Sequence, residues 1–154
     1  MKKLALLVVL ALSMPCWASW SFTGLSGAQD NVAGAIGMTF DDGQAQAGLS
    51  FLSTDTGSED YRTALGPYAS MRIEVPVLSS MFNEDVETFA GGAFLFDTDQ
   101  HKWMATPFIG VIMLPERKIS PVAVYRYQWM DGSMNAPEFE EGSTGFVGLR
   151  ILID

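Results

Sequence analysis

The stretch that decides the fold is Asn31–Leu52, which reads NVAGAIGMTFDDGQAQAGLSFL. Before the Asp-Asp-Gly turn at 41–43, large apolar residues alternate with Ala, Gly and Thr, and a period of two resumes after the turn. This period is that of a β-strand, and Asp-Gly between two such runs is typical of a tight hairpin. The stretch therefore predicts two antiparallel strands with one bulky apolar face and one face of small residues. Such faces fit lipid on the outside and a crowded barrel interior on the inside.

Segments with the same period follow one another along the chain. They cover 20–27, 31–40, 45–53, 61–75, 86–97, 103–114, 119–130 and 143–153. An even number of strands, each about 9–15 residues long, suits a closed membrane barrel. The predicted fold class is all-β, a single antiparallel up-and-down transmembrane β-barrel of about eight strands.

Residues 1–18 have the layout of a secretory signal peptide. Lys2 and Lys3 form a basic start, an uncharged apolar run follows over Leu4–Met14, and Ala18 offers a small residue for cleavage. The run is too short for a membrane-spanning helix, which needs about 20 residues. We predict cleavage after Ala18, export, and a β-barrel domain that spans residues 19–154.

Cys16 is the only cysteine of the chain. It would be the acylated residue of a lipoprotein, but Pro15 stands where a lipobox has Gly or Ala. Cleavage after Ala18 removes Cys16 and therefore every thiol that could form a disulfide, bind a metal or act as a nucleophile. Cleavage also removes Lys2 and Lys3, which leaves seven of the nine basic residues against eighteen acidic ones, a formal charge of −11. This charge argues against nucleic acid as a partner.

The connections between the predicted strands form two groups. If both termini lie inside the cell envelope, the outward connections are 28–31, 54–60, 98–102 and 131–142, and the inward ones are 41–44, 76–85 and 115–118. Three of the four outward connections carry an excess of acidic residues. We therefore expect acidic external loops whose partners are outer-membrane lipids and lipopolysaccharide, bridged by divalent cations.

Aromatic residues gather at the ends of the predicted strands. The candidate aromatic girdle consists of Trp20 at the inner end and Tyr61, Trp103 and Trp129 at the outer end, and girdles of this kind mark the two membrane interfaces. The alternative is that these rings form the core of a water-soluble β-sandwich or lipocalin-like barrel. The opposite face is rich in Gly and Ala and sparse in charge, which makes it a poor water-exposed surface.

Polar residues with inward parity form a candidate lumen network, which consists of Arg62, Arg72, Glu74, Glu87, Arg126, Gln128 and Arg150. Eight strands leave room for side chains and one small ligand, so we do not expect a general porin. Because buried charge must be paired, we expect a plug of ion pairs and hydrogen bonds. Replacing Arg72 by Leu in a buried pair should cost about 3–5 kcal/mol. The alternative is that the four arginines line an anion path or hold an anionic group.

Four segments have a distinctive composition, and they are NVAGAIGMTF (31–40), GLSFLSTDTGSED (48–60), VAVYRYQWMDG (122–132) and GSTGFVGLRILID (142–154). Together these segments resemble the small outer-membrane barrels of the YfaZ type. The resemblance implies a location in the outer membrane of a Gram-negative bacterium, insertion by the barrel-assembly machinery, and no reaction. The chain departs from such barrels at Leu152-Ile153-Asp154, where they finish on an aromatic residue.

The residues that could support catalysis or bind a metal lie in predicted loops. His101 is the sole histidine and has no serine at triad spacing, so we predict no hydrolase site and no enzyme activity. Asp97 and Asp99, like the acids of 54–60, lack a recognised metal-ligand spacing, so no metal or cofactor is predicted. The most favoured role is structural or interactive. Two other functions stay open, a soluble periplasmic barrel that binds a small apolar ligand and a lipid-modifying outer-membrane enzyme.

Overall fold

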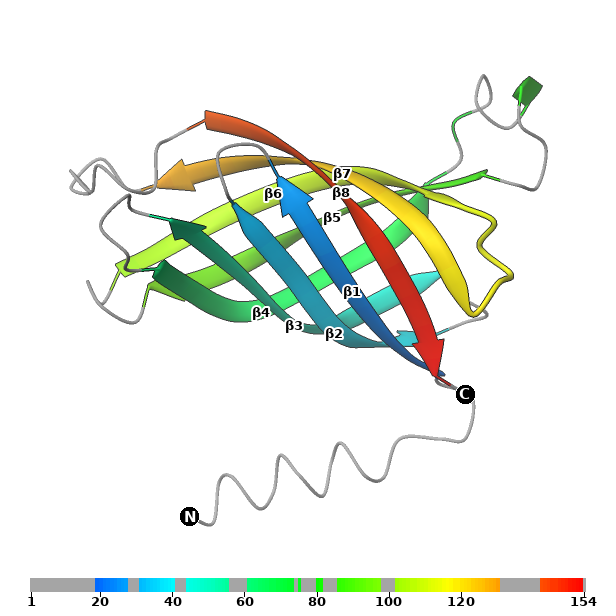
Figure 1. Ribbon diagram of the computed structural model, residues 1–154, viewed down its shortest axis with the longest axis horizontal. Coiled ribbons are helices and arrows are strands. Elements are labelled where there is room, and N and C mark those ends of the chain that lie inside the picture. Colours follow the sequence, from blue (N-terminus) through cyan, green and yellow to red (C-terminus); the bar gives the residue numbers. More distant parts are fainter. Residues whose placement is uncertain are drawn as a thin grey trace, which may run out of the picture.

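The computed structural model describes residues 19–27, 31–40, 44–55, 61–73, 75, 80–81, 86–97, 102–130 and 142–153. Eight antiparallel strands form a closed barrel in which each strand pairs with the next and the last pairs with the first (Figure 1). They are β1 (Ser19–Gly27), β2 (Val32–Phe40), β3 (Ala45–Asp55), β4 (Tyr61–Ile73), β5 (Val86–Asp97), β6 (Lys102–Met113), β7 (Ile119–Met130) and β8 (Gly142–Ile153). The predicted all-β up-and-down barrel is confirmed.

The two ends of the barrel carry different connections. At one end β1 begins and β8 ends, beside the connections 41–44, 74–85 and 114–118, and we call it the terminus end (Figure 1). The opposite end carries 28–31, 56–60, 98–101 and 131–141, and we call it the loop end. This grouping agrees with the one predicted from the sequence. The predicted signal peptide, residues 1–18, and most of the acidic loops lie outside the described residues.

Three strand ends differ from the prediction. β3 continues to Asp55, two residues past the expected end at residue 53. β4 ends at Ile73, two residues before the expected end at Val75. β6 ends at Met113 because Leu114 has a φ of 53°, a left-handed conformation that cannot continue a strand. A turn follows, in which the Arg117 N–H donates to the Leu114 carbonyl at 3.0 Å. This turn brings the backbone of residues 114–117 to the terminus end of the lumen.

Residues 31–52 form the β2–β3 hairpin, and its two faces are those predicted from the sequence. Ile36 pairs with Leu49, and both side chains are exposed on the outer wall. Ala33 and Thr39, which have the opposite parity, are buried in the lumen. A slip of one residue would exchange the two faces of a strand, so the alternation fixes the register.

Glycines on the inner wall make room for large rings. A Cβ on Gly37 of β2 would collide with the Tyr68 hydroxyl and lie 2.7 Å from the Ala47 carbonyl oxygen. A Cβ on Gly110 of β6 would collide with the Phe89 ring. The small residues of the inner face are therefore the complement of a few bulky side chains that fill the barrel.

The hydrophobic core of the molecule is the lumen. Its buried apolar members are Leu25, Ala33, Leu52, Ala64, Tyr68, Ala93, Leu95, Met104, Ile112, Val122, Val124 and Phe146. Leu52, Leu95 and Met104 lie near the loop end of their strands, whereas the polar side chains Thr39, Ser120 and Arg150 lie near the terminus end. Polar Asp97 and Gln128 are also buried near the loop end, and apolar Ile112 and Val122 near the terminus end, so both ends of the lumen contain both kinds of side chain.

Candidate functional site in the barrel lumen

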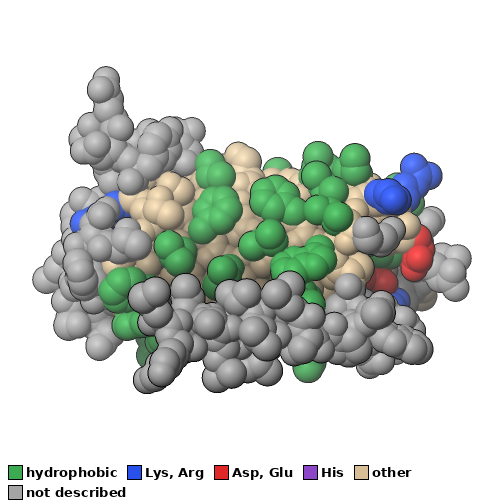
Figure 2. Space-filling model, turned by 90° about the horizontal axis from the view of Figure 1, so that it is seen from below, with side chains coloured by type: hydrophobic (Ala, Val, Ile, Leu, Met, Phe, Trp, Pro, Cys, Tyr) green, Lys and Arg blue, Asp and Glu red, His purple; other side chains and the backbone are tan. Residues whose placement is uncertain are grey.

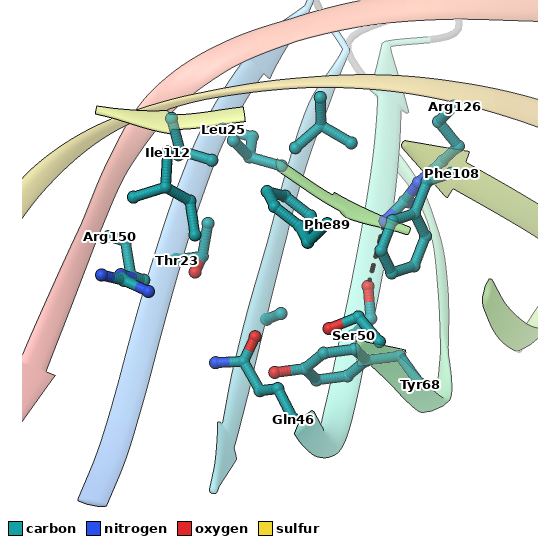
Figure 3. Close-up of a pocket in the computed structure, with 14 residues that line it drawn as sticks. Thr23, Leu25, Gln46, Ser50, Tyr68, Phe89, Phe108, Ile112, Arg126 and Arg150 are labelled. Carbon is teal, nitrogen blue, oxygen red and sulfur yellow. Dashed lines mark hydrogen bonds between the residues drawn. The ribbon is translucent and has the colours of Figure 1, made fainter. Parts of the chain in front are cut away.

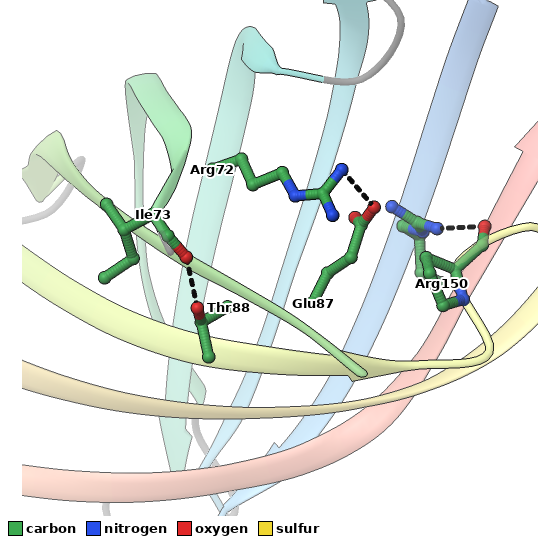
Figure 4. Close-up of polar contacts among 6 residues, drawn as sticks. Arg72, Ile73, Glu87, Thr88 and Arg150 are labelled. Atoms are coloured by element: carbon green, nitrogen blue, oxygen red, sulfur yellow. Dashed lines mark hydrogen bonds and ion pairs between the residues drawn. The ribbon is translucent and has the colours of Figure 1, made fainter. Parts of the chain in front are cut away.

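An ion pair lies just inside the terminus end (Figure 4). Arg72 is the next-to-last residue of β4 and Glu87 is the second residue of β5, and the strand pairing sets both on the inner face. Arg72 Nη1 lies 2.9 Å from Glu87 Oε1. The Arg72 side chain is 37% exposed and that of Glu87 is 16% exposed, so water reaches the pair. Such a pair contributes less to stability than a buried one.

Arg150 occupies the same end from the opposite wall. It lies in β8, is buried, and its Nη2 donates to the Pro115 carbonyl at 2.7 Å. The turn that begins at Leu114 presents this carbonyl, and Ser120 Oγ supports the turn by donating to the Leu114 carbonyl at 2.9 Å. In the view of Figure 4 the Glu87 carboxylate lies between the guanidinium groups of Arg72 and Arg150. Three predicted network residues are therefore gathered at the terminus end.

Arg126 lies apart from this group and reaches across the barrel (Figure 3). It stands in β7, and its Nη2 donates to Ser50 Oγ of β3 at 3.2 Å. In the order of strands around the barrel β3 and β7 are on opposite sides, so this bond spans the lumen. Ser50 in turn donates to the Gly34 carbonyl at 3.1 Å. The Arg126 guanidinium is therefore tied to the far wall through one hydroxyl.

Two phenyl rings flank the Arg126 guanidinium. Its central carbon lies 5.9 Å from the ring centroid of Phe108 and 5.7 Å from that of Phe146. Cations attract the faces of aromatic rings at such distances, and the attraction is stronger where water is excluded. Arg126 is only 4% exposed. The rings therefore stabilise a positive charge that the barrel has removed from water.

A cavity of about 40 Å³ lies between Arg126 and Arg150 (Figure 3). Its polar lining includes Ser50, Tyr68 and Gln46, and its apolar lining includes Phe89, Phe108 and Ile112. A second cavity of about 20 Å³ lies at Arg72 and Glu87 and shares Gln46, Phe89 and Arg150 with the first. A water needs roughly 10–15 Å³, so both spaces together hold a few waters or one small ion.

The remaining predicted network residues are dispersed. Arg62 is half-buried near the start of β4 at the loop end, and Gln128 is buried near the end of β7. Glu74 lies outside the described residues. The single plug that the sequence predicts is therefore divided into a group at the terminus end, a bridge across the middle, and separate residues toward the loop end.

Sequence reasoning missed several residues of the lumen. Asp97 ends the predicted strand 86–97 but was considered only as a loop acid; it is the last residue of β5 and is 3% exposed. It shares the parity of Glu87, and continuing that alternation along the strand would have found it. Ser50, Phe108 and Phe146 were missed because their common partner, Arg126, reaches them across the closed barrel or from neighbouring strands.

Three members of the predicted girdle have described side chains. Trp20, Trp103 and Trp129 are exposed on the outer wall near the ends of their strands. Trp103 stacks on Phe94 with ring centroids 4.9 Å apart and an interplanar angle of 19°. The side chain of Tyr61 lies outside the described residues, although its backbone begins β4.

The described residues offer no arrangement of metal ligands. Among them, no group of three or more His, Cys, Asp or Glu side chains is placed to hold an ion. His101, Asp99 and the acids of 56–60 lie outside the described residues. No helix in the described part of the chain is long and apolar enough to cross a membrane.

Comparison with known proteins shows the same architecture. The crystal structure of the N-terminal β-barrel domain of OprF from Pseudomonas aeruginosa is similar to this chain with a TM-score of 0.62 and 12% sequence identity. The similarity covers 88% of this chain and 96% of the OprF domain. No protein-family model matches the sequence, and no curated protein matches it. At this identity the similarity concerns the fold alone.

Proposed function

We propose that the protein is an outer-membrane β-barrel of a Gram-negative bacterium with a structural or interaction role, exported through a cleaved signal peptide. The observation that carries this proposal is the outer wall of the barrel. Large apolar side chains cover it on every strand, with exposed fractions from 38% for Ile151 to 66% for Val147. Water-soluble proteins rarely expose so large a continuous apolar surface. Hydrocarbon chains of lipid are the natural neighbours of such a wall.

The charged side chains of the strands are distributed as expected for a barrel that spans a membrane. Every charged strand residue with a described side chain has inward parity, and these residues are Arg62, Arg72, Glu87, Asp97, Arg126 and Arg150. Figure 2 shows one face of the molecule with hydrophobic side chains over its middle and the visible charged side chains at its two ends. A charged side chain on the lipid face of a barrel is costly at the bilayer midplane and much less so near the interfaces. The distribution of charge therefore supports a membrane-spanning wall.

The contents of the lumen support a structural role over transport. Rings and aliphatic side chains fill much of the lumen, and Arg126 crosses its middle to bond with Ser50. The described cavities hold only a few waters. A barrel filled in this way presents its connections outward on a rigid frame. We propose that the acidic outward loops interact with lipopolysaccharide through divalent cations, and that the barrel-assembly machinery inserts the chain.

The similarity to the OprF barrel domain supports the proposal through the fold alone, because closed antiparallel barrels with an even number of strands are the type found in outer membranes. Membership of the YfaZ-type family stays a proposal, since it rests on the sequence resemblance alone. A soluble periplasmic barrel is the second candidate, and its one supporting observation is the partly apolar cavity lined by Phe89, Phe108 and Ile112. A soluble barrel would expose its apolar outer wall to water.

Membrane fractionation with gel mobility tests the proposal. The protein should sediment with outer membranes of an expressing Gram-negative bacterium, and the unboiled form should migrate differently from the boiled one, because folded membrane barrels resist detergent without heat. A protein recovered in the periplasmic soluble fraction, with mobility unchanged by boiling, would refute the membrane assignment and favour the soluble barrel.

Thiol labelling of whole cells tests the orientation. With Cys16 removed by cleavage, a cysteine introduced by Ser133→Cys should react with an impermeant maleimide, since the proposal sets residues 131–141 outside. The matched variant Glu116→Cys, in the exposed turn at the terminus end, should react only after the outer membrane is permeabilised. Labelling of Glu116→Cys alone on intact cells would mean that the barrel is inserted in the opposite direction.

A further inference from the structure

We infer that the lumen holds a small monovalent anion, of halide size, at the guanidinium group of Arg126. The inference goes beyond the proposed outer-membrane role and does not depend on any external partner. It starts from the hydrogen bonds of Arg126. Its Nη2 donates to Ser50 Oγ, but its Nε and Nη1 are buried and have no hydrogen-bond partner in the structure. An arginine has five N–H donors and no acceptor, so these groups need acceptors from elsewhere.

The protein supplies no negative charge at this point. Among the described residues, no carboxylate lies within ion-pair distance of Arg126, whereas Arg72 at the terminus end has Glu87 at 2.9 Å. The rings of Phe108 and Phe146 attract the cation but accept no conventional hydrogen bond from its N–H groups. A buried charge is costly unless it is both paired and hydrogen-bonded. Arg126 therefore lacks a counter-charge, and its Nε and Nη1 lack acceptors.

Arg126 is one of the residues that line the larger cavity, and this lining suits an anion. The lining includes Arg126 and Arg150, and the polar groups between them include the Ser50 hydroxyl, the Tyr68 hydroxyl and the Gln46 side-chain amide. The Tyr68 hydroxyl and the Gln46 amide can donate hydrogen bonds, whereas the Ser50 hydroxyl already donates to the Gly34 carbonyl, and none of the residues that line this cavity is acidic. Figure 3 shows Ser50, Tyr68 and Gln46 along one side of this space. Two guanidinium groups and several donors with no carboxylate define an electropositive site.

The size of the cavity limits which ligands can bind in it. At about 40 Å³ it has room for roughly three water-sized occupants, hence for a halide ion with one or two waters. A phosphate ester, a nucleotide or a fatty acid would not fit. The second cavity of about 20 Å³ continues toward Arg72 and Glu87 at the terminus end. An anion would therefore enter from the terminus end past Arg150.

The test uses the full mature protein folded in detergent micelles, with bromide and chloride as probes and gluconate as the large control anion at constant ionic strength. Thermal unfolding should show a saturable rise of about 3–5 °C in the midpoint when chloride or bromide replaces gluconate. The line width of the chloride NMR resonance should show excess broadening by the protein, and bromide should compete it away. An equal midpoint in all three salts, with no excess broadening, would overturn the inference and mean that water alone satisfies Arg126.

Two variants test whether the anion binds at Arg126. Arg126→Met keeps a side chain of similar length without the charge, and buried ionic groups replaced by apolar ones often leave stability unchanged or raised. This variant should lose both the midpoint shift and the excess broadening. Arg117→Met removes a positive charge from the exposed 114–118 turn, outside the lumen, and should keep both. If Arg126→Met keeps the full halide response, the anion does not bind at Arg126 and the inference fails.

Ser50→Ala provides a second route should Arg126→Met fail to fold. It keeps the guanidinium group and removes the hydroxyl that lies 3.2 Å from Arg126 Nη2. The concentration of bromide at half-saturation should change at least threefold, because the Arg126 guanidinium group loses the acceptor that fixes its position. An unchanged half-saturation in this variant would mean that the halide binds elsewhere.

Discussion

The outer wall and the lumen of this barrel are built from the same strands but obey different constraints. On the wall, Met71 is exposed with other apolar side chains, and any apolar residue of similar size would serve there. Its neighbour in sequence, Arg72, turns into the barrel and meets one specific partner, Glu87. The medium around the barrel constrains the polarity of a wall residue. A specific partner side chain constrains the identity of a lumen residue. Changes on the wall should therefore depend on polarity alone, and changes in the lumen on the loss of a particular contact.

The largest effect is expected from a charged side chain placed on the outer wall. Leu149 lies in the interior of β8, is half-exposed, and pairs with Gly24 and Pro121. Leu149→Arg should destabilise the folded barrel in phospholipid vesicles by about 2–4 kcal/mol, the cost of a basic residue near the bilayer midplane. Urea unfolding in vesicles measures the change, with Leu149→Met as a control expected to be nearly silent. A Leu149→Arg protein as stable as wild type would mean that this wall faces water.

An intermediate effect is expected in the lumen from the Arg72–Glu87 pair. The sequence alone suggested about 3–5 kcal/mol for Arg72→Leu on the assumption of a buried pair. Because the Arg72 side chain is 37% exposed, water screens the charges, and we expect a loss of about 1 kcal/mol. The adjacent wall substitution Met71→Leu is the matched control and should change the free energy of unfolding by much less. A larger effect at Met71 than at Arg72 would mean that the two faces of β4 are inverted.

The smallest effect concerns the backbone of the wall. Pro107 of β6 pairs with Gly92 of β5, but the β6–β7 ladder lacks the pairs at Thr106 and Pro107 between the Ala105 and Phe108 positions. Proline has no N–H to donate to a neighbouring strand. The missing N–H of Pro107 therefore accounts for the loss of the β6–β7 pairs at Thr106 and Pro107. Pro107→Val restores the donor and should stabilise the barrel by about 0.5–1 kcal/mol, a gain reduced by the greater freedom of the unfolded chain.

Urea unfolding in vesicles also measures this change, with Ala105→Val as a control. That substitution adds methyl groups to the same strand without adding a donor to the ladder. Equal shifts in the two variants would mean that the gain comes from apolar surface rather than from the restored hydrogen bond.

Much of the fold could be predicted from the sequence because its evidence is local. The Asp-Asp-Gly turn and the alternation on both sides of it specify the β2–β3 hairpin within residues 31–52. The same alternation predicted all eight strands to within a few residues. The errors lie where one backbone conformation decides the boundary, as at Leu114 with its φ of 53°. No periodicity contains that information, because it describes where side chains point and not where a chain turns.

The candidate site was predicted only in part, since inward parity could be read along each strand but contacts could not. Parity identified Arg72, Glu87, Arg126 and Arg150 as inward residues. It could not tell that Arg72 meets Glu87 at a rim open to water, or that Arg126 bonds with Ser50 at a distance of 76 residues along the chain. Parity also made no distinction among the four inward arginines, Arg62, Arg72, Arg126 and Arg150. The structure separates one paired at the rim from one that is buried without a carboxylate.

The sequence by itself determined the class of fold, the number of strands and the face on which each side chain lies. These properties follow from a period of two residues and from turn chemistry, which act over a few neighbouring positions. The tertiary structure alone decided which inward side chains meet, how much water reaches them, and where the lumen stays empty. Those properties depend on closing β8 against β1 and on the alignment of all the strand pairs between them, so they bring together residues that no local pattern connects.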